Sequence, residues 1–345
     1  MKLVITINDL ETENPRYTTM VAAEAASAMG HEVWIVTADA FGQAADGKLT
    51  AIGRQAPADV DDGGFLDALR DVDTEPLFID DADVLWLRNN PADDMVDRPW
   101  VSTAVLLFGQ LASARGVIVV NDPFKLTNAL NKIYFQRVPA AARPRTMISR
   151  SVDAIKEFLE SLDGDGVVKP LQGSGGRNVF VVRNGDTENV NQMIEAISRD
   201  GFVVAQECLP EASEGDIRLF LMNGRPLKSD SGQLAAMRRV NDTGDARSNL
   251  HAGGEAVQCE VGSEVLDLAE LVRPMLIADG MFLVGLDIVG DKLMEVNVFS
   301  PGGLNCCEAL LDDDFVSPVI RALERKVEHK RRYGATIRNV DYATL

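Results

Sequence analysis

Two apolar segments joined by a short turn, near residue 290, constrain the fold of this chain more than any other feature. The segments cover residues 282–289 and 293–298, and Gly290-Asp291 lies between them. Apolar stretches of strand length on either side of a Gly-Asp pair predict a β-hairpin. We therefore expect a hairpin made largely of Val, Ile and Leu that packs against the core.

Three oxygen-bearing side chains interrupt this apolar hairpin. Because strand side chains alternate between the faces of a sheet, Glu295 and Asn297 point to one face, and the hairpin can bring Asp287 beside them. A buried carboxylate without a cation is costly, whereas Mg²⁺ prefers hard oxygen ligands and shares its coordination shell with nucleotide phosphates. The pattern predicts a magnesium site, and the alternative is an exposed hairpin with ordinary polar positions.

Length and composition indicate the class of protein. A chain of 345 residues with 46% hydrophobic residues can bury a large core and suggests two or three domains. The four cysteines fit neither a disulfide framework nor a zinc site, because Cys306 and Cys307 are adjacent while Cys208 and Cys259 are isolated. No apolar run reaches transmembrane length and no signal-peptide pattern begins the chain, so we expect a cytoplasmic, reduced protein.

The chain is strongly acidic, with a formal net charge of −19. This charge argues against nucleic acid or an anionic membrane as the main partner. Binding a phosphate-rich ligand against such a background requires a local cluster of Lys and Arg. The positions of the basic residues are therefore the informative ones.

The first third of the chain alternates strands with helices. Apolar strand patterns occur at 3–7, 32–36, 84–87 and 116–120, and helical patterns at 18–29 and 102–114. This alternation predicts a parallel α/β domain over residues 1–121. The polar, Asp- and Gly-rich segment 41–83 is interpreted as a long insertion or loop that can contain one helix. No G-x-G-x-x-G follows the first strand, which argues against dinucleotide binding.

Arg88 directly follows the third of these strands. Ligands of open α/β sheets bind where the carboxyl ends of the strands open to solvent, and a guanidinium there can hold a carboxylate through two hydrogen bonds. Arg88 is thus a candidate for binding an acidic substrate, and the alternative is a solvated loop arginine.

The central third contains a strand, a glycine-rich turn and a second strand. Lys169 interrupts the apolar strand that begins at Val167, residues 172–177 read Gln-Gly-Ser-Gly-Gly-Arg, and a second apolar strand covers 178–182. Exposed backbone N–H groups in such a turn can cradle phosphate oxygens, and a lysine on the adjacent strand adds a point charge. No Gly-Lys-Ser/Thr ends the turn, so it is not a Walker A loop. An ordinary hairpin is the alternative.

Arginines gather in the acidic second half of the chain. They are Arg218, Arg238, Arg239 and Arg247. This region contains a strand at 216–222, an Asn-Gly turn, a return strand from Arg225 and a glycine-ended segment at 247–254, and a helix of about 262–279 follows. We interpret this concentration of arginines in an acidic protein as an anion-binding site.

Five longer motifs occur in a fixed order. They are Val-Val-Lys-Pro-Leu-x-Gly-x-Gly-Gly from Val167, Ala-Gln-x-x-Leu-Pro from Ala205, Gly-Asp-x-Arg from Gly215, Arg-x-Asn-Leu-x-Ala-Gly-Gly from Arg247, and Val-Gly-Leu-Asp-Ile-x-Gly-Asp-x-Leu-x-Glu-x-Asn-Val-x-Ser-Pro from Val284. Together they resemble the prokaryotic glutathione synthetases, which are ATP-grasp ligases, over about residues 84–325. The resemblance implies a two-lobed ATP-grasp domain with mainly antiparallel sheets after the N-terminal domain. Its parts are a lobe at 122–205 with the lysines and the glycine-rich loop, a lobe at 206–330 with the metal and substrate residues, and a C-terminal tail at 331–345.

The resemblance also implies a role for each matching residue. The residues implied for ATP are Lys132, Lys169, Gly173, Ser174, Gly175, Gly176, Gln206, Glu207, Cys208, Leu209 and Glu214. Those implied for Mg²⁺ or Mn²⁺ are Asp287, Glu295 and Asn297. Arg218 and Arg239 are implied to face the reacting phosphoryl group and carboxylate. Those implied for the substrate are Arg88, Arg247, Asn249, Ser300, Gly302 and Gly303.

The implied reaction forms an amide bond with ATP as co-substrate. The γ-phosphoryl group passes to a carboxylate, and an amine then displaces phosphate from the acyl phosphate. Such a transfer needs positioning and charge neutralisation rather than a protein nucleophile, which agrees with this set of lysines, arginines and metal ligands. The implied partners are ATP, a peptide-like acid and an amino-acid amine, and we expect a homo-oligomer that binds neither nucleic acid nor membrane.

The segment after the hairpin departs from the family pattern. Where the family has a polar segment containing a threonine, a cysteine and an arginine, residues 302–308 read Gly-Gly-Leu-Asn-Cys-Cys-Glu without an arginine. We interpret the cysteine pair as buried at the start of a helix. Three hypotheses follow: a glutathione synthetase joining γ-glutamylcysteine to glycine, an ATP-grasp ligase for a different acid or amine, such as a dipeptide or glutamate-adding ligase, and a non-catalytic nucleotide-binding protein.

Overall fold

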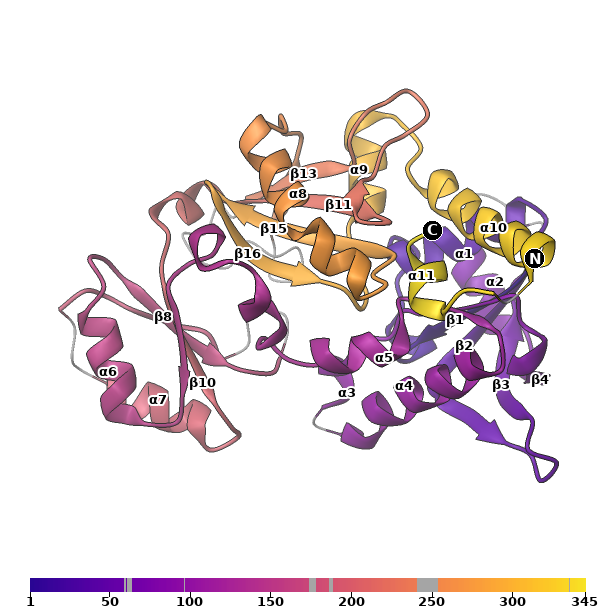
Figure 1. The fold of residues 1–345 in the computed structure, drawn as a ribbon, viewed down its shortest axis with the longest axis horizontal. Coiled ribbons are helices and arrows are strands. Elements are labelled where there is room, and N and C mark those ends of the chain that lie inside the picture. Colours follow the sequence, from indigo (N-terminus) through magenta and orange to yellow (C-terminus); the bar gives the residue numbers. More distant parts are fainter. Residues whose placement is uncertain are drawn as a thin grey trace.

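The computed structural model describes residues 1–58, 60, 64–95, 97–173, 178–185, 189–240, 254–334 and 336–345. Within them the strands form three sheets, which follow one another along the longest axis of the molecule (Figure 1). The N-terminal sheet lies at one end, a four-stranded sheet lies at the other, and the third sheet lies between them. Among the helices of this described part, none is long and apolar enough to span a membrane.

The N-terminal sheet confirms the predicted parallel α/β domain. Its central strand β1 (Lys2–Ile7) pairs in parallel with β2 (Glu32–Gln43) and with β5 (Val84–Leu87), and β5 pairs in parallel with β6 (Ile118–Val120). Strands that are buried on both faces read as continuous apolar runs, and this is why the sequence located all four.

Segment 41–83 belongs to the same sheet, so its interpretation as an insertion is wrong. It contains β3 (Leu49–Gln55), α2 (Phe65–Asp71) and β4 (Glu75–Phe78), and the two strands extend the sheet in antiparallel pairing beyond β2. In β3 the buried positions alternate with more exposed ones and hold only Leu, Ala, and Gly. An edge extension with small buried residues gives a much weaker hydrophobic signal than a central parallel strand.

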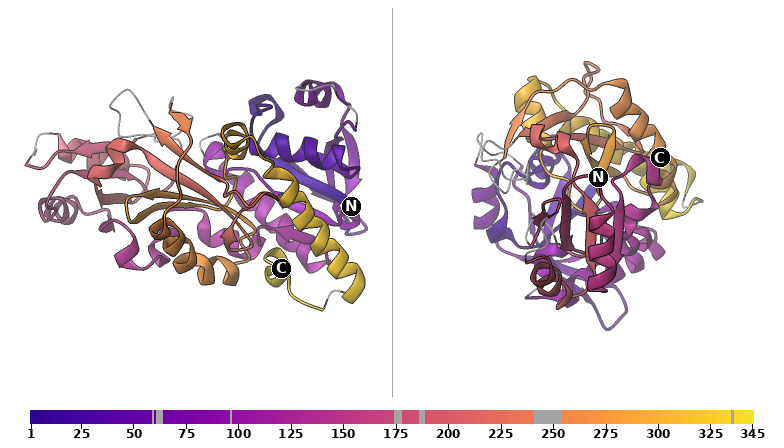
Figure 2. Two further views of the ribbon diagram at one scale, coloured as in Figure 1. Left: turned by 90° about the horizontal axis from the view of Figure 1, so that it is seen from above. Right: turned by 90° about the vertical axis from the view of Figure 1, so that its left-hand side faces the viewer.

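Helices cover both faces of the N-terminal sheet because successive strand residues point to opposite sides. On one face, Leu3 and Ile5 of β1 share a core with α1 (Thr18–Ala28) and α10 (Val316–Tyr333). On the other face, Val4 shares a core with α4 (Pro99–Ala114). Figure 2 shows α10, in yellow, beside the N-terminal segment, so the C-terminal part of the chain completes the N-terminal domain.

The four-stranded sheet forms a small lobe with its own core. Its strands, in order, are β7 (Thr146–Ser149), β10 (Val203–Glu207), β8 (Gly166–Pro170) and β9 (Phe180–Val182), all antiparallel. The helices α6 (Val152–Glu160) and α7 (Val190–Ser198) pack against it. The core contains Ile155, Val168 and Ile194 and is separate from the other two clusters. The predicted strand, turn and strand around 172–177 correspond to β8 and β9.

The third sheet contains the predicted hairpin. Its strands, in order, are β14 (Glu255–Val257), β13 (Ala236–Val240), β11 (Asp216–Met222), β15 (Leu283–Val289) and β16 (Lys292–Asn297), and β12 (Arg225–Pro226) also pairs with β11. The hairpin β15–β16 is confirmed, and Gly290 in its turn has a φ of +55°, which favours glycine. The sheet is covered by α8 (Ser263–Ala278), which packs with Leu219 of β11, and by α9 (Leu304–Leu311), which packs with Phe220.

Asn121 joins the N-terminal sheet to the hairpin. It directly follows β6, and only 3% of its surface is exposed. The side-chain amide donates to the carbonyls of Leu283 and Val298, while its oxygen accepts from the N–H groups of Phe282 and Leu283. Because these buried backbone groups depend on one side chain for their partners, Asn121 couples the two sheets.

The C-terminal segment packs on the edge of the N-terminal sheet. The helix α10 runs through residue 330, where the sequence-based division begins a tail, and α11 (Asn339–Ala343) follows. Asn339 donates to the carbonyl of Val119 and accepts from the N–H group of the same residue, so it pairs with β6. The other predicted boundaries fall just after β6 and within β10. The division into domains stays a prediction.

Replacing Asn121 with alanine should destabilise the protein by about 2–4 kcal/mol, because several buried backbone groups lose their partners at roughly 1–3 kcal/mol each. Denaturant-induced unfolding followed by circular dichroism measures this change in free energy. Asn128→Ala is the matched control, since Asn128 is exposed and a surface substitution changes stability by only about 0.5 kcal/mol. Equal stability of the two variants would contradict the coupling role.

Candidate functional site

The centre of the site is a buried network of two carboxylates and two guanidiniums on the third sheet. Arg218 of β11 lies opposite Asp287 of β15 in the strand register, and its Nη2 donates to the Oδ2 atom of Asp287 at 3.0 Å. Arg239 of β13 reaches the same carboxylate at 2.9 Å and also pairs with Asp216 of β11. All four residues are less than 9% exposed. The neighbouring strands therefore bring together a charge-balanced cluster in the core.

Protonation states in this network follow from the pairing. Burial acts to raise the pKa of Asp287, but the guanidiniums of Arg218 and Arg239 hold it well below its usual range. Burial acts to lower the pKa of Arg239, but Asp287 and Asp216 together raise it. Asp287 is thus an anion and Arg239 a cation at every physiological pH.

The three predicted metal ligands lie side by side. Glu295 of β16 is the strand partner of Asp287, and the side-chain amide of Asn297 donates to the Oδ2 atom of Asp287 at 3.1 Å. Glu295 is exposed and Asn297 is half-buried. Two carboxylates and an amide oxygen are hard donors, which fit Mg²⁺ or Mn²⁺. Among the described residues no group of three His, Cys, Asp or Glu side chains could hold a metal ion, so a metal here depends on the amide.

The two predicted lysines lie near enough to Glu295 for its charge to act on both. Lys132 Nζ donates to the carbonyl of Gly173 at 2.9 Å, and Lys169 Nζ donates to the Oε1 atom of Gln206, also at 2.9 Å. Burial lowers the pKa of Lys132 and lowers that of Lys169 to about 8, while the charge of Glu295 opposes both shifts. Two half-buried lysines near one carboxylate form a cationic surface suited to phosphate groups.

The residues implied for adenine lie at the end of β10 and in the connection that follows. Gln206 and Glu207 belong to β10, and the Glu207 carboxylate accepts from the N–H group of Arg145 at 2.8 Å. The N–H group of Cys208 donates to the carbonyl of Asp165 at 2.8 Å. Leu209 precedes the short helix Pro210–Glu214, whose last residue is Glu214 and which links the small lobe to β11. This connection therefore joins the four-stranded sheet to the third sheet.

Arg238 does not join the other arginines. It occupies the position in β13 next to Arg239, so it points to the opposite face, and it donates to the carbonyl of Glu214 at 3.4 Å. The predicted cluster of four arginines is therefore wrong at this position. Five predicted residues lie outside the described part of the chain: Ser174, Gly175, Gly176, Arg247 and Asn249.

Arg88 is buried, which excludes the alternative of a solvated loop arginine. It is 3% exposed, and its guanidinium lies over the ring of Trp86 at 5.3 Å. It donates to the Oγ1 atom of Thr19 at 3.1 Å and to the carbonyl of Pro301 at 3.2 Å. Arg88 therefore connects the carboxyl end of β5 to the loop at 300–303.

The loop at 300–303 is held from two sides. Arg218 donates to the carbonyl of Gly302 at 3.0 Å, next to the Pro301 carbonyl that Arg88 contacts. Ser300 is half-buried, and Gly303, at a φ of +100°, is the residue before α9. The loop thus links the buried charge network with the N-terminal domain, which the sequence alone did not predict.

The cysteine pair lies where the sequence analysis expected it. Cys306 and Cys307 are in the first turns of α9, and Cys307 is fully buried. Burial raises the pKa of both thiols, so they are protonated and unreactive at neutral pH. Asp216 was missed as a member of the site, although it stands in the quoted Gly-Asp-x-Arg motif.

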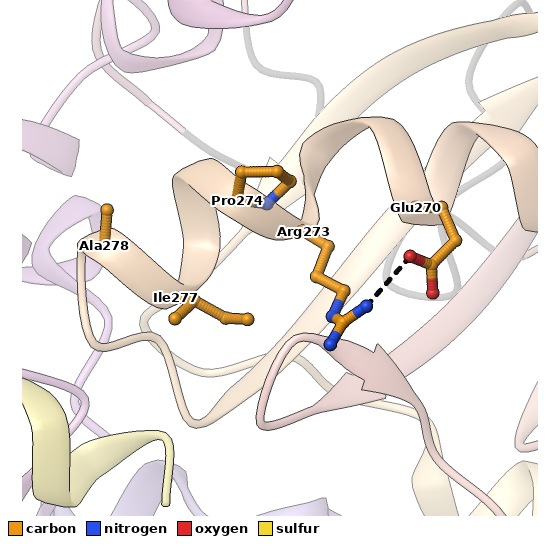
Figure 3. Close-up of a pocket in the computed structure, with 5 residues that line it drawn as sticks. All are labelled: Glu270, Arg273, Pro274, Ile277 and Ala278. Atoms are coloured by element: carbon orange, nitrogen blue, oxygen red, sulfur yellow. Dashed lines mark hydrogen bonds and ion pairs between the residues drawn. The ribbon is translucent and has the colours of Figure 1, made fainter.

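A pocket along α8 shares no residue with this site (Figure 3). It is lined by Glu270, Arg273, Pro274, Ile277 and Ala278. The cation among these lining residues, Arg273, is paired with Glu270 at 3.1 Å. The predicted residues on the third sheet therefore remain the candidate site.

Comparison with known proteins agrees with this arrangement. The N-terminal domain of prokaryotic glutathione synthetase matches residues 1–127, and the ATP-grasp domain of prokaryotic glutathione synthetase matches residues 131–312. The chain belongs to the prokaryotic glutathione synthetase family. Glutathione synthetase of Nostoc sp. (strain PCC 7120) is 30% identical over 95% of this chain and 99% of its own length. That of Gloeobacter violaceus is 31% identical over 92% of this chain and 95% of its own length.

Solved structures place this glutathione synthetase family member among the ATP-grasp proteins. The ATP-grasp ligase PsnB, in complex with minimal precursor, Mg and ADP, has a TM-score of 0.58 at 17% identity and covers 94% of this chain and 98% of PsnB. The D-cycloserine synthetase DcsG has a TM-score of 0.60 at 12% identity, covering 93% of this chain and 99% of DcsG. The predicted ATP-grasp fold is confirmed, and the chain is an ATP-dependent ligase.

Binding of ATP should weaken as the pH rises from about 7 to 9.5. Lys169 has a pKa of about 8, so it loses its charge in this range, and phosphates bind the charged form more tightly. Lys169→Gln should weaken binding at pH 7 and flatten the pH profile. Isothermal titration calorimetry of ATP at several pH values measures both effects. Lys156→Gln, on α6 of the same lobe, is the control, and a flat profile for the unmodified protein would contradict the phosphate role of Lys169.

Proposed function

We propose that this ligase joins γ-glutamylcysteine to glycine with hydrolysis of ATP, and that the predicted site residues carry out the reaction. The supporting observation is the loop at 300–303, which Arg218 of the buried charge network and Arg88 of the N-terminal domain hold through adjacent carbonyl groups. A second support is the alignment with relatives named glutathione synthetase over almost their whole length.

The first chemical step transfers the γ-phosphoryl group of ATP to an oxygen of the cysteinyl carboxylate. ADP leaves, and the product is an acyl phosphate whose phosphate is a far better leaving group than oxide. The amine of the acceptor then attacks the acyl carbon, the C–N bond forms, and inorganic phosphate leaves with the acyl C–O bond broken. Charge neutralisation around the phosphoryl group lowers the barrier of such transfers, and no protein nucleophile is needed.

The charge network supplies the groups nearest to this transfer. Arg218 and Arg239 carry the positive charge, and their pairing with Asp287 fixes the position of both guanidiniums before substrate binds. Preorganised charges of this kind stabilise a transition state without further rearrangement. Arg218 also contacts the loop at 300–303, so it orients the phosphoryl-accepting carboxylate relative to the substrate-binding loop.

Asp287, Glu295 and Asn297 would hold the magnesium ions. Their oxygen atoms fit a hard cation, and Asp287 and Glu295 are direct neighbours across the hairpin. Bound Mg²⁺ supplies neutralisation of phosphate charge. Arg218 donates to both oxygens of Asp287, and a carboxylate oxygen has a further lone pair with which it would hold the metal.

Lys132 and Lys169 would bind the ATP phosphates from the side of the small lobe. Lys132 contacts the carbonyl of Gly173, where the glycine-rich loop begins. Lys169 is held by Gln206 at the start of the proposed adenine connection. The charge of Glu295 acts on both lysines, and their partial burial would limit water near the acyl phosphate.

The two arginines lie close enough together to contact one γ-glutamyl dipeptide. Arg88 and Arg218 bind carbonyl groups of consecutive residues, whose Cα atoms are about 3.8 Å apart. Their guanidiniums therefore lie within roughly 12 Å of each other, and an extended γ-glutamyl dipeptide spans on the order of 10 Å between its carboxylates. One arginine can thus hold the distal carboxylate while the other faces the carboxylate that is activated.

Segment 302–308 favours a second candidate, a ligase with an acceptor other than glycine. The segment has no arginine for an acceptor carboxylate, and its one acidic residue, Glu308, accepts from the N–H groups of Phe315 and Val316.

A coupled assay of ADP release tests the function directly. γ-Glutamylcysteine is supplied with ATP and each member of a panel of amino acids. Glycine should give the highest kcat/KM. If another amine is faster, the second candidate is correct. If γ-glutamylcysteine stimulates no ADP release with any amine, it is not the acid substrate, and both candidates fail.

Asp287→Asn and Glu295→Gln should each lower kcat by several orders of magnitude, because they remove negative charge that faces Mg²⁺. Steady-state kinetics at saturating ATP, with magnesium varied, measures the loss. Asp291→Asn in the turn of the same hairpin is the control, since its side chain is 76% exposed and pairs only with the neighbouring Lys292 among the described residues. Near-normal turnover of either variant at ordinary magnesium would contradict the metal assignment.

Arg88→Ala should raise the KM for γ-glutamylcysteine tenfold or more and leave the KM for ATP unchanged. A charge-assisted hydrogen bond to a substrate carboxylate contributes about 1.5–3 kcal/mol. Arg88→Lys should also be impaired, because an ammonium lacks the planar fork of the guanidinium. Arg115→Ala is the control, because Arg115 is an exposed residue of the same domain that pairs with Asp80. An effect of Arg88→Ala on the KM for ATP alone would contradict this role.

A further inference from the structure

Two oppositely charged groups at the edge of the N-terminal sheet keep polar atoms without partners. Arg88 uses two of its nitrogens, but its Nη1 atom is buried and has no hydrogen-bond partner among the described residues. The Oε2 atom of Glu13 is also buried and, within the same described part of the chain, has no partner. Such atoms carry the full cost of losing water, so each points to a group that is supplied by something other than the folded chain.

The two residues stand at the position in the fold where a ligand is expected. Glu13 follows β1 and the short helix at Leu10–Thr12, and Arg88 follows β5. The chain leaves β1 toward β2 on one side, and β5 pairs with β1 on the other side. The carboxyl ends of β1 and β5 therefore form a topological switch point, which is where open α/β sheets bind ligands.

The charges of Glu13 and Arg88 influence each other. Burial raises the pKa of Glu13 to about 7, with Arg88 opposing this shift and Asp93 adding to it. Burial lowers the pKa of Arg88 to about 10, and Glu13 opposes this shift. Glu13 and Arg88 are both described, yet they form no ion pair with each other. A carboxylate that served only as the counter-ion of Arg88 would be expected to form a direct ion pair with it.

We propose that Glu13 is a specificity-determining residue that binds the α-ammonium group of the acid substrate, beside Arg88, which binds its α-carboxylate. An α-amino-acid head carries both charges on one carbon, so a neighbouring anion and cation in a half-dry crevice match it with no net charge. The inference rests on the proposed function, because γ-glutamylcysteine has such a head group at the end far from the activated carboxylate. The sequence analysis did not single out Glu13.

Two acid substrates separate this role from a structural one. The first is γ-glutamylcysteine, and the second is glutarylcysteine, which is identical except that it lacks the α-amino group. The kcat/KM for each acid is measured by ADP release at saturating ATP and glycine, with the unmodified protein, Glu13→Gln and Glu13→Asp. Glu11→Gln is the matched control, because Glu11 lies two residues earlier, in the short helix that precedes Glu13, and is exposed. Thermal unfolding of each variant is recorded in parallel.

The unmodified protein should prefer γ-glutamylcysteine to glutarylcysteine by tenfold or more, as expected for one charge-assisted hydrogen bond. Glu13→Gln should reduce this preference to less than about threefold, mainly through a higher KM for γ-glutamylcysteine. Its Tm should be unchanged or higher, since a partnerless buried carboxylate is removed. Glu13→Asp should keep an intermediate preference, and Glu11→Gln should behave as the unmodified protein.

A preference that survives in Glu13→Gln overturns the inference while leaving the proposed function intact. The same conclusion follows if Glu13→Gln lowers the Tm and slows both acids equally, because that result marks a structural residue. If the unmodified protein turns over neither acid, the proposed function itself fails and the role of Glu13 fails with it.

Discussion

Asp287 is buried between two guanidiniums, and the arrangement of the third sheet depends on this interaction. Removing a carboxylate from water costs several kcal/mol, and only good pairing offsets that cost. The strand order places β13, β11 and β15 side by side, so that Arg239, Arg218 and Asp287 meet across neighbouring strands. Asp216 balances the second guanidinium. Loss of any one partner would leave a buried charge uncompensated, at about 3–5 kcal/mol.

This charge network lies at the meeting point of all three sheets. Glu295, the strand partner of Asp287, interacts electrostatically with Lys132 and Lys169. Lys169 belongs to the small lobe, and Lys132 contacts Gly173 of the same lobe. Arg218 connects the charge network through the loop at 300–303 to Arg88 of the N-terminal domain. The small lobe has a core of its own, so a movement of that lobe as a unit would change the distance between the lysines and the hairpin without disturbing either core.

The sequence predicted those parts of the site whose residues lie close together along the chain. Asp287, Glu295 and Asn297 follow from the two-residue period of a strand and one tight turn, and both features are local. Arg88 was placed at the end of a strand, but its burial depends on Thr19 and Pro301, which are far away in sequence. Asp216 stands in the Gly-Asp-x-Arg motif, but its pairing with Arg239 depends on a neighbouring strand. No local pattern marks Glu13.

The elements of the fold that were predicted likewise have a local sequence pattern, and those that were missed depend on contacts distant in sequence. The central parallel strands of the N-terminal sheet were predicted because they are apolar on both faces. β3 and β4 were missed because their buried positions are few and small. The packing of α10 on the N-terminal domain joins the two ends of the described chain, and such a contact has no signature in either segment alone.

The central claim is that the γ-phosphoryl group of ATP is transferred to the substrate carboxylate, which gives an acyl phosphate. Transfer of ¹⁸O tests it most directly. γ-Glutamylcysteine labelled with ¹⁸O in the cysteinyl carboxylate is converted with ATP and glycine, and the released phosphate is analysed by mass spectrometry. The account predicts one ¹⁸O atom in each phosphate, because the acyl C–O bond breaks when the amine attacks. Phosphate without label, released together with the amide product, would contradict it.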